Sequence, residues 1–230
     1  MPQEKINKTE KYNKAISPAV VNRLPRYYRY LSELLRNETF KISSKELSEL
    51  MNVTASQIRQ DLNCFGGFGQ QGYGYNIQQL HGEIGRILGV ERGFSAVVVG
   101  AGNLGRTLSK SGLFIKRGVI LKALFDVSPD IIGTEIAGFV VKNIKDAACY
   151  CRENKVDIAV LTLPKDETES VANMLSSSGG VKGFWNFSNM ELKLGTPDMS
   201  DESDISDIFV ENMHMGDSLM TLCYNLNLKK

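Results

Sequence analysis

The sequence has no long hydrophobic run, only two histidines and only four cysteines among its 230 residues. No apolar stretch approaches the ~20 residues that a helix needs to cross a bilayer. The first eighteen residues are polar and lack the apolar centre of a secretory signal peptide. We therefore expect a cytoplasmic protein with no membrane partner.

The cysteines and histidines are too few and too scattered for the usual metal and catalytic sites. Cys149 and Cys151 point to different faces of a predicted helix and form a poor metal clip, so we expect reduced thiols and no metal. His81 lies in a predicted helical connector and His214 at the start of a predicted final helix. No Ser/His/Asp set is found that could supply acid–base catalysis. The sequence predicts no catalytic residue.

The composition is that of a globular protein, with 42% hydrophobic and 23% charged residues and a net charge of +1. The first 85 residues are weakly basic and the remainder is weakly acidic. This asymmetry is too small to imply nucleic-acid binding by itself. The length allows one large domain or two modest ones.

Hydrophobic residues recur with a helical period in the first ninety residues. The pattern predicts a helix over 18–37, with a kink or a true start near Pro25. Two capping boxes, Ser43 with Glu46 and Thr54 with Gln57, predict two short helices separated by a tight link. A glycine-rich aromatic segment then predicts a hairpin, and a further helix leads to the predicted domain boundary at "GVERG".

The second of these short helices, over 55–65, has one apolar and one polar face. Ile58, Leu62 and Phe65 form the apolar face, and the polar face consists of Ser56, Arg59, Gln60 and Asn63. Arg can bridge guanine, and Gln or Asn can bridge adenine, in the major groove. The two helices predict a helix-turn-helix and the hairpin a wing, with Tyr73 and Tyr75 on its return strand. The alternative is a helical packing or dimerisation domain with a solvated polar face.

From Phe94 onward, strand-like runs alternate with predicted helices over 104–115, 144–153 and 166–177, which is typical of a parallel sheet covered on both faces. The first run ends in "VVVGAGNLG", a G-x-G-x-x-G motif. Gly100 would make a tight turn, Gly102 would let the backbone approach a pyrophosphate, and Gly105 would let helix and strand pack closely. The alternative is a glycine turn in an ordinary α/β domain.

Asp126 ends the next predicted strand, twenty-one residues after Gly105. A carboxylate there accepts a hydrogen bond from a ribose 2′-hydroxyl and repels a 2′-phosphate, which favours NAD(H) over NADP(H). Little chain remains for a substrate domain. A small NAD-dependent oxidoreductase, or a CoA- or nucleotide-binding module with a helical interaction domain, remains the alternative function.

Six segments, in order along the chain, resemble the Rex family of bacterial redox-sensing transcriptional repressors: "RLPRYYRYL", "SSKELSEL", "IRQDLNCFGGFGQQGYGYN", "GAGNLG", "LTLP" and "KGFWNF". The resemblance implies a winged-helix domain over 18–90 after a flexible arm over 1–17, a Rossmann domain over 91–211, and a C-terminal helix over 212–230 that swaps into the partner of a homodimer. It implies binding to palindromic double-stranded DNA operators, with release on NADH binding.

The resemblance also assigns site residues. It implies that the recognition helix, Arg59 above all, meets DNA together with the wing residues Gly72, Tyr73, Gly74 and Tyr75. It implies that NAD(H) is held by Gly100, Ala101, Gly102, Asn103, Leu104, Gly105 and Asp126, with Thr162, Pro164, Asn186 and Phe187 near the nicotinamide.

Several positions depart from the family pattern. Gln60, Gln70 and Gln71 stand where the family commonly has basic residues, so we expect fewer phosphate contacts and weaker salt dependence. The resemblance implies a redox switch made of a tyrosine, an aspartate and an arginine, which are matched here by Ser111, His214 and Arg29. Two of the three differ, so we expect NADH to release DNA less sharply.

Overall fold

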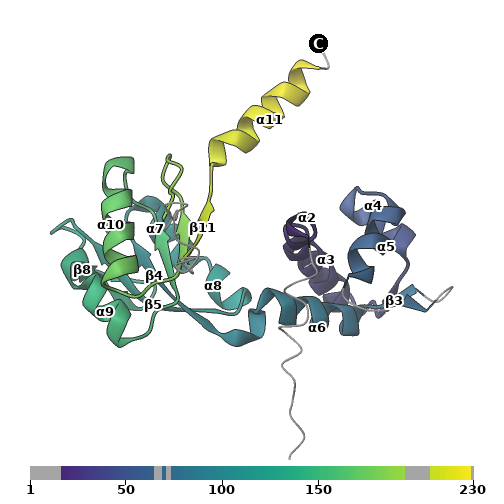
Figure 1. The fold of residues 1–230 in the computed structure, drawn as a ribbon, viewed down its shortest axis with the longest axis horizontal. Helices are drawn as coiled ribbons and strands as arrows, with labels where there is room; N and C mark the ends of the chain where they lie inside the picture. Colours follow the sequence, from purple (N-terminus) through teal and green to yellow (C-terminus); the bar gives the residue numbers. More distant parts are fainter. Residues whose placement is uncertain (1–16, 65–68, 71–73, 195–207, 229–230) are drawn as a thin grey trace, which may run out of the picture. The chain divides into compact units, whose positions relative to one another are not determined.

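The computed structural model describes residues 17–64, 69–70, 74–194 and 208–228, and these form two compact units that divide between Arg92 and Gly93 (Figure 1). The predicted boundary lay two residues earlier. The difference arises because a short 3-10 turn, η1 (Val90–Arg92), directly continues the last helix of the first unit. The predicted arm over 1–17 lies outside the described residues except for Ser17.

The first unit combines helices with a small antiparallel sheet. Its elements are α2 (Pro18–Val21), α3 (Leu24–Arg36), β1 (Lys41–Ile42), α4 (Ser44–Met51), α5 (Ala55–Asn63), β2 (Gly69–Gln70), β3 (Gly74–Asn76) and α6 (Ile77–Leu88). Pro25 lies in the first turn of α3, where its missing N–H costs no hydrogen bond, so the predicted helix start near Pro25 is confirmed. The sheet order is β1-β3-β2. Strands β2 and β3 form the predicted hairpin, and β1 is an additional strand that the sequence patterns did not predict.

One apolar core holds the first unit together. Leu31 of α3, Leu47 of α4, Ile58 of α5 and Leu80 of α6 are all fully buried in the same cluster. Burying side chains of this size stabilises a domain by about 1.5–3 kcal/mol each. The apolar faces of the helices predicted from the sequence therefore pack in a single core.

The second unit is built around a six-stranded parallel sheet of order β11-β10-β9-β4-β5-β8. The strands are β4 (Phe94–Val99), β5 (Val119–Asp126), β8 (Lys142–Asn143), β9 (Ile158–Leu161), β10 (Gly183–Asn186) and β11 (Phe209–Asn212), and a separate hairpin is made of β6 (Glu135–Ile136) and β7 (Phe139–Val140). The helices are α7 (Asn103–Lys110), α8 (Leu113–Lys116), η2 (Ile144–Asp146), α9 (Ala147–Glu153), α10 (Lys165–Ser177) and α11 (Met215–Asn227).

Helices cover both faces of the sheet, as the alternating pattern predicted (Figure 1). Val97 and Val99 of β4 pack with Cys151 of α9 and Leu175 of α10 in one cluster. Val98, which points to the other face, packs in a second cluster that includes the α8 side chain Phe114. The parallel α/β architecture of this unit is therefore confirmed.

The predicted helix over 104–115 is wrong as a single helix. α7 ends at Lys110, and Gly112 adopts a left-handed conformation with φ of 65° before α8 begins. Glycine reaches this region without a Cβ penalty, so the chain changes direction there.

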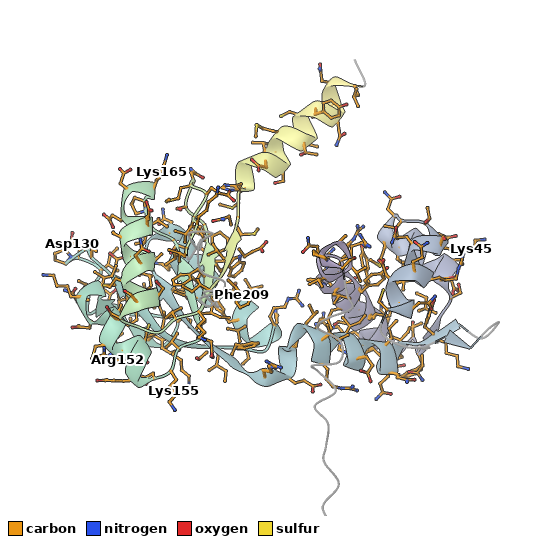
Figure 2. The ribbon with its side chains drawn as sticks, viewed as in Figure 1. Lys45, Asp130, Arg152, Lys155, Lys165 and Phe209 are labelled. Atoms are coloured by element: carbon orange, nitrogen blue, oxygen red, sulfur yellow. The ribbon has the colours of Figure 1, made fainter. Side chains whose placement is uncertain are left out.

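The last helix, α11, lacks a buried face in the chain. Every residue from Met215 to Leu228 is exposed, although the helix carries a large apolar stripe. Its exposed apolar residues are Met215, Leu219, Met220, Leu222, Tyr224 and Leu226. Phe209, at the start of β11, is 75% exposed as well (Figure 2). Apolar surface of this extent marks an interaction site.

Candidate functional site

The polar side chains of the predicted recognition helix all lie on the exposed face of α5. Ile58 and Leu62 are buried in the core of the first unit and fix the helix by its other face. The exposed residues are Ser56, Arg59, Gln60 and Asn63. Phe65, predicted as a third apolar residue, lies outside the described residues. A helix that is held by one face and offers Arg, Gln and Asn on the other suits a major groove.

N-caps fix where α4 and α5 begin. Ser43 accepts a hydrogen bond from the Glu46 N–H at 3.1 Å, and the Glu46 carboxylate accepts from the Ser43 N–H at 2.8 Å, so the first capping box is confirmed. Thr54 caps α5 by accepting from the Gln57 N–H at 3.1 Å. The second box is wrong in its return bond, because the Gln57 side chain donates to Asp61 instead.

A buried carboxylate on α5 is a feature that the sequence patterns did not single out. Asp61 is fully buried and accepts hydrogen bonds from Arg23 Nε and Nη2 at 2.7 Å each, from the Tyr27 hydroxyl at 2.9 Å and from Gln57 Nε2 at 2.8 Å. Burial alone would raise the pKa of Asp61, but hydrogen bonds from Arg23, Gln57 and Tyr27 outweigh it and hold the pKa below its usual value. The ionised carboxylate ties α5 to the N-terminal end of α3.

Arg59 is positioned by the helix that precedes α5. Its Nη1 donates a hydrogen bond to Ser44 Oγ, 3.2 Å away, at the first residue of α4. Arg59 is the one cation in α5. The contact holds the guanidinium on the outer side of the helix pair.

Two of the four predicted wing residues, Gly74 and Tyr75, lie among the described residues. Gly74 has φ of 73°, and a Cβ there would lie 2.7 Å from the Ile42 carbonyl oxygen, so the fold requires glycine. Tyr75 is only 8% exposed and belongs to the core of the unit. Its ring supports the wing from inside, and its expected contact with DNA stays a prediction. Gly72 and Tyr73 lie outside the described residues.

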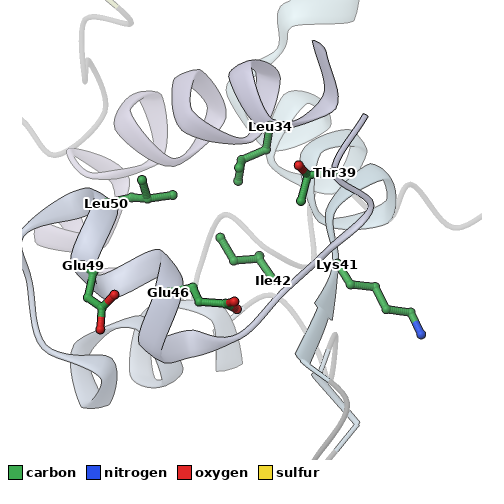
Figure 3. A pocket seen from close by; sticks show the side chains of 7 residues that line it. All are labelled: Leu34, Thr39, Lys41, Ile42, Glu46, Glu49 and Leu50. Atoms are coloured by element: carbon green, nitrogen blue, oxygen red, sulfur yellow. The ribbon is translucent and has the colours of Figure 1, made fainter. Parts of the chain in front are cut away.

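A groove of about 440 Å³ lies beside α4, away from the exposed face of α5 (Figure 3). Its lining consists of Leu34, Thr39, Lys41, Ile42, Glu46, Glu49 and Leu50. Glu46 and Glu49 place two carboxylates at the groove and Lys41 one cation, beside apolar side chains of Leu34, Ile42 and Leu50 (Figure 3). The lining has more acidic than basic groups and offers no cluster of cations that would bind a phosphate.

Two glycines of the G-x-G-x-x-G loop are required by the fold. Gly100 has φ of 99°, and a Cβ there would lie 2.6 Å from the carbonyl oxygen of Thr162. A Cβ on Gly105 would lie 2.0 Å from the carbonyl oxygen of Gly100. The predicted tight turn and close helix–strand packing are therefore confirmed.

Gly102 is different, because nothing lies within 4 Å of the place where its Cβ would be. It is exposed and precedes α7 as an N-cap without a side-chain hydrogen bond. The backbone N–H groups of Asn103, Leu104 and Gly105 form the first turn of α7, where a helix favours an anion. The loop therefore presents a bare backbone on the side from which a pyrophosphate would approach.

Asp126 holds this loop. Its two carboxylate oxygens accept hydrogen bonds from the Ala101 N–H at 2.6 Å and from the Ser128 N–H at 2.8 Å. The sequence predicted Asp126 at the nucleotide site but not these backbone contacts. The carboxylate therefore fixes the turn beside the position where a ribose would lie.

The strand order gathers the other predicted cofactor residues at the same edge. β4 lies between β5 and β9, so the carboxyl end of β4 is the switch point at which α/β sheets bind ligands. Thr162 follows β9 and donates from Oγ1 to the Gly100 carbonyl at 2.6 Å. Pro164 is exposed at the start of α10. Phe187 follows β10, with its ring 4.6 Å from that of Trp185.

Asn186 lies at this edge, and both the oxygen and the nitrogen of its side-chain amide have hydrogen-bond partners within the chain. It is fully buried; its Oδ1 accepts from the Ser188 N–H and hydroxyl, and its Nδ2 donates to Met190 O and Asn212 Oδ1. Its expected place near the nicotinamide stays a prediction. Asn186 ties the loop after β10 to β11.

Of the three predicted switch residues, Arg29 belongs to the first unit, and Ser111 and His214 belong to the second. Arg29, on α3, is exposed and lies over the ring of Tyr30 at 5.3 Å. The Ser111 hydroxyl donates to Leu108 O at 2.7 Å and accepts from the Leu113 N–H at 3.2 Å, so it is engaged in the turn between α7 and α8. His214 Nε2 lies 3.0 Å from Glu191 Oε2 and does not cap α11.

His81 and Cys151 both have structural surroundings. His81 stacks on Tyr28 with ring centres 4.2 Å apart, bonds Ser32 Oγ at 2.9 Å, and has its pKa lowered by burial. Burial raises the pKa of Cys151 to about 11, which leaves a protonated thiol. Among the described residues, no cluster of His, Cys, Asp or Glu suits a metal ion, and no helix has the length and apolar character to cross a membrane.

The chain matches two known family models. Residues 15–63 match the family described as putative DNA-binding protein N-terminus. Residues 91–190 match the family described as CoA binding domain. The first match contains α3, α4 and α5, and the second contains the strands from β4 to β10.

Curated relatives cover nearly the whole chain. The redox-sensing transcriptional repressor Rex of Thermoanaerobacter sp. (strain X514) is 47% identical over 92% of this chain and 90% of its own length. This chain belongs to the Rex family. A second Rex, from Clostridium botulinum (strain Alaska E43 / Type E3), is 43% identical over 95% of this chain and 99% of its own. Close Rex relatives are named as repressors, not enzymes.

Solved Rex-family structures have the same fold. The structure of RSP in complex with beta-NAD+ and operator DNA matches with a TM-score of 0.82 and 45% identity, covering 93% of this chain and 94% of RSP. RSP in complex with beta-NADH matches with a TM-score of 0.81 and 42% identity, covering 93% and 95%. The winged-helix and Rossmann architecture is thereby confirmed.

Proposed function

We propose that this chain is a transcriptional repressor that binds palindromic double-stranded DNA operators as a homodimer, under the control of NAD+ and NADH. The observation that carries the proposal is the exposed Arg–Gln–Asn face of α5, in the same chain as an open dinucleotide loop. Its place of action is the cytoplasm, where a bacterial repressor meets both operator DNA and the NAD(H) pool.

On DNA, α5 lies in the major groove and Arg59 bridges a guanine, while Gln60 and Asn63 bond adenine edges and Ser56 bonds a phosphate or base. The wing contributes backbone contacts around Gly72 and Gly74 and a ring or hydroxyl from Tyr73. Because Arg59 is the single cation of α5, the helix itself offers few contacts to phosphate.

In the second unit, NAD(H) lies across the carboxyl edge of the sheet. Its pyrophosphate bonds the N–H groups of the Gly102–Gly105 turn, and the remaining lone pairs of Asp126 accept from the adenosine ribose. Thr162, Pro164 and Phe187 line the nicotinamide end. The cofactor supplies no chemistry to this protein; its redox state selects between conformations.

The homodimer is held by α11. Each protomer exposes a helix with an apolar stripe, and a swapped position on the partner's second unit buries this stripe. Two-fold symmetry then presents two copies of α5 to half-sites about one helical turn apart.

The redox response is weaker than in typical family members. Ser111 is short and engaged in its own turn, and His214 pairs with Glu191, so neither reproduces the tyrosine and aspartate that the family resemblance implies. A ligand shifts a conformational equilibrium only by the difference between its affinities for the two conformations. With fewer switch contacts, NADH favours the DNA-releasing conformation less strongly.

The test is operator binding by Arg59→Ala, measured at fixed salt in parallel with Arg36→Ala. Both variants remove one exposed cation of the first unit. Loss of one bidentate base contact costs roughly 1–3 kcal/mol, so Arg59→Ala should weaken specific binding about tenfold or more while Arg36→Ala stays near wild type. Unchanged operator affinity in Arg59→Ala would refute the docking.

Coenzyme A distinguishes the alternative function suggested by the CoA binding domain match. NADH bound to the protein should be displaced by NAD+ and not by coenzyme A. Displacement by coenzyme A together with no preference for any DNA palindrome would favour a CoA-binding module.

A further inference from the structure

We infer that Asp61 is a positioning residue that sets the sequence specificity of α5 by fixing its rotation. This inference rests on the proposed DNA-binding function. It concerns an ion pair formed by the buried Asp61 with the partly exposed Arg23 and completed by Tyr27 and Gln57.

The contacts of Asp61 come from two directions. Arg23 and Tyr27 lie one turn apart at the N-terminal end of α3, and Gln57 lies one turn earlier on α5 itself. The guanidinium donates to both carboxylate oxygens at 2.7 Å, which is the planar bidentate geometry that tolerates little rotation. We call this set of contacts between Asp61, Arg23, Tyr27 and Gln57 the clamp. It determines the rotation of α5 about its own axis relative to α3.

The exposed face of α5 amplifies any change at this clamp. Residues two apart differ by about 200° around a helix. Asp61 therefore lies opposite Arg59 and Asn63, whose side chains extend toward the solvent. A recognition site tolerates errors of only about 10–20° in orientation, so a small rotation moves Arg59 out of register with its base.

Electrostatic stabilisation alone does not explain this pair. Replacing a buried ion pair by well-packed apolar residues is often neutral or stabilising, because desolvation offsets the charge attraction. Apolar contacts, however, are non-directional and leave a helix free to rotate slightly. The directional pair is therefore suited to fixing orientation rather than to holding the fold together.

The decisive variant is the double substitution Arg23→Met with Asp61→Leu. It removes one positive and one negative charge, so the net charge of the protein is unchanged, and the affinity for a random duplex controls for any change in non-specific attraction. Its matched control is Arg86→Met with Glu83→Leu, which removes an exposed ion pair of α6 with a 2.6 Å contact. For each, we would measure the melting temperature, the operator affinity and the affinity for a random duplex of equal length.

The double variant at Arg23 and Asp61 should fold, keep its random-duplex affinity and lose about tenfold or more in operator affinity, the size of one lost bidentate contact. The control should keep both affinities. An unchanged ratio of operator to random-duplex affinity would overturn the inference. A wild-type protein without preference for the operator would instead overturn the proposed function.

Asp61→Asn decides the case if the double variant fails to fold. This isosteric change removes the charge but keeps most of the volume, and binding can be measured well below its melting temperature. Simple destabilisation lowers the amount of active protein and leaves the affinity ratio of the folded fraction unchanged. A reduced ratio supports the positioning role, and an unchanged ratio refutes it.

Discussion

At the scale of the residue, the loop after β4 contains glycines of two kinds. Gly100 and Gly105 are required by their own surroundings, because added Cβ atoms would collide with backbone oxygens. Gly102 has open space beside it and adopts an ordinary φ of −69°. The free side of Gly102 is therefore explained by a ligand rather than by the fold.

This difference predicts opposite outcomes for two alanine substitutions. Gly102→Ala should change the free energy of unfolding by less than about 0.5 kcal/mol and lower NADH affinity at least tenfold. Gly105→Ala should lower the free energy of unfolding by about 1–3 kcal/mol or more, because the helix must move. Thermal unfolding and an NADH titration measure both effects.

The control for these variants is Gly82→Ala on α6, where nothing lies within 4 Å of an added Cβ. It should stabilise the helix by about 0.5–1 kcal/mol and leave NADH affinity unchanged. A Gly102→Ala protein that binds NADH like the wild type would remove the loop from the nucleotide site.

Sequence patterns identified candidate site residues better than they predicted the burial and the hydrogen bonds of the side chains. The motif and the carboxylate after the next strand placed Gly100, Gly102 and Asp126 at the site. The same patterns missed the buried state of Tyr75 and Asn186, because burial depends on which strand lies opposite. Asp61 escaped notice because its partner Arg23 is thirty-eight residues away in sequence.

At the scale of the element, periodic and capped helices were predicted, whereas the shortest isolated strands were not. α3, α6 and α10 bury several apolar residues with a clear helical period. The two-residue strands β1 and β8 have no period of their own and exist only through pairing with distant strands. The break between α7 and α8 depends on one left-handed glycine.

The apolar stripe of α11 predicts that this helix forms the dimer. Leu222→Ser with Leu226→Ser should convert the protein to monomer in sedimentation velocity, since both side chains are more than half exposed in the single chain. Operator affinity should fall with it, because two half-sites are then no longer bound by one linked unit.

Thr221→Ser with Asn225→Ser is the matched control, since it changes two polar residues of α11 with the same spacing. It should remain dimeric. Truncation after Met213 gives an independent check that keeps β11 and its hydrogen bond from the Met213 N–H to Asn186 O at 2.8 Å. A stable dimer in the truncated protein would exclude α11 as the dimer contact.

At the scale of the whole molecule, two units of different architecture are joined in one chain, one for DNA and one for a dinucleotide. Coupling between them is a difference in free energy, commonly about 1–3 kcal/mol. The residues expected to provide it differ from the family pattern at Ser111 and His214, while Arg29 is retained. The response to NADH is therefore the property of the molecule that depends most on these departures.

The most direct test is the ratio of operator affinities at saturating NAD+ and saturating NADH, measured for the wild type and for Ser111→Tyr with His214→Asp. The wild-type ratio should exceed one but stay well below about a hundredfold, the upper range of ordinary allosteric coupling, and the double variant should raise it. Equal wild-type affinities with the two nucleotides would contradict control by NAD(H). A wild-type ratio of about a hundredfold or more would contradict the weakened switch.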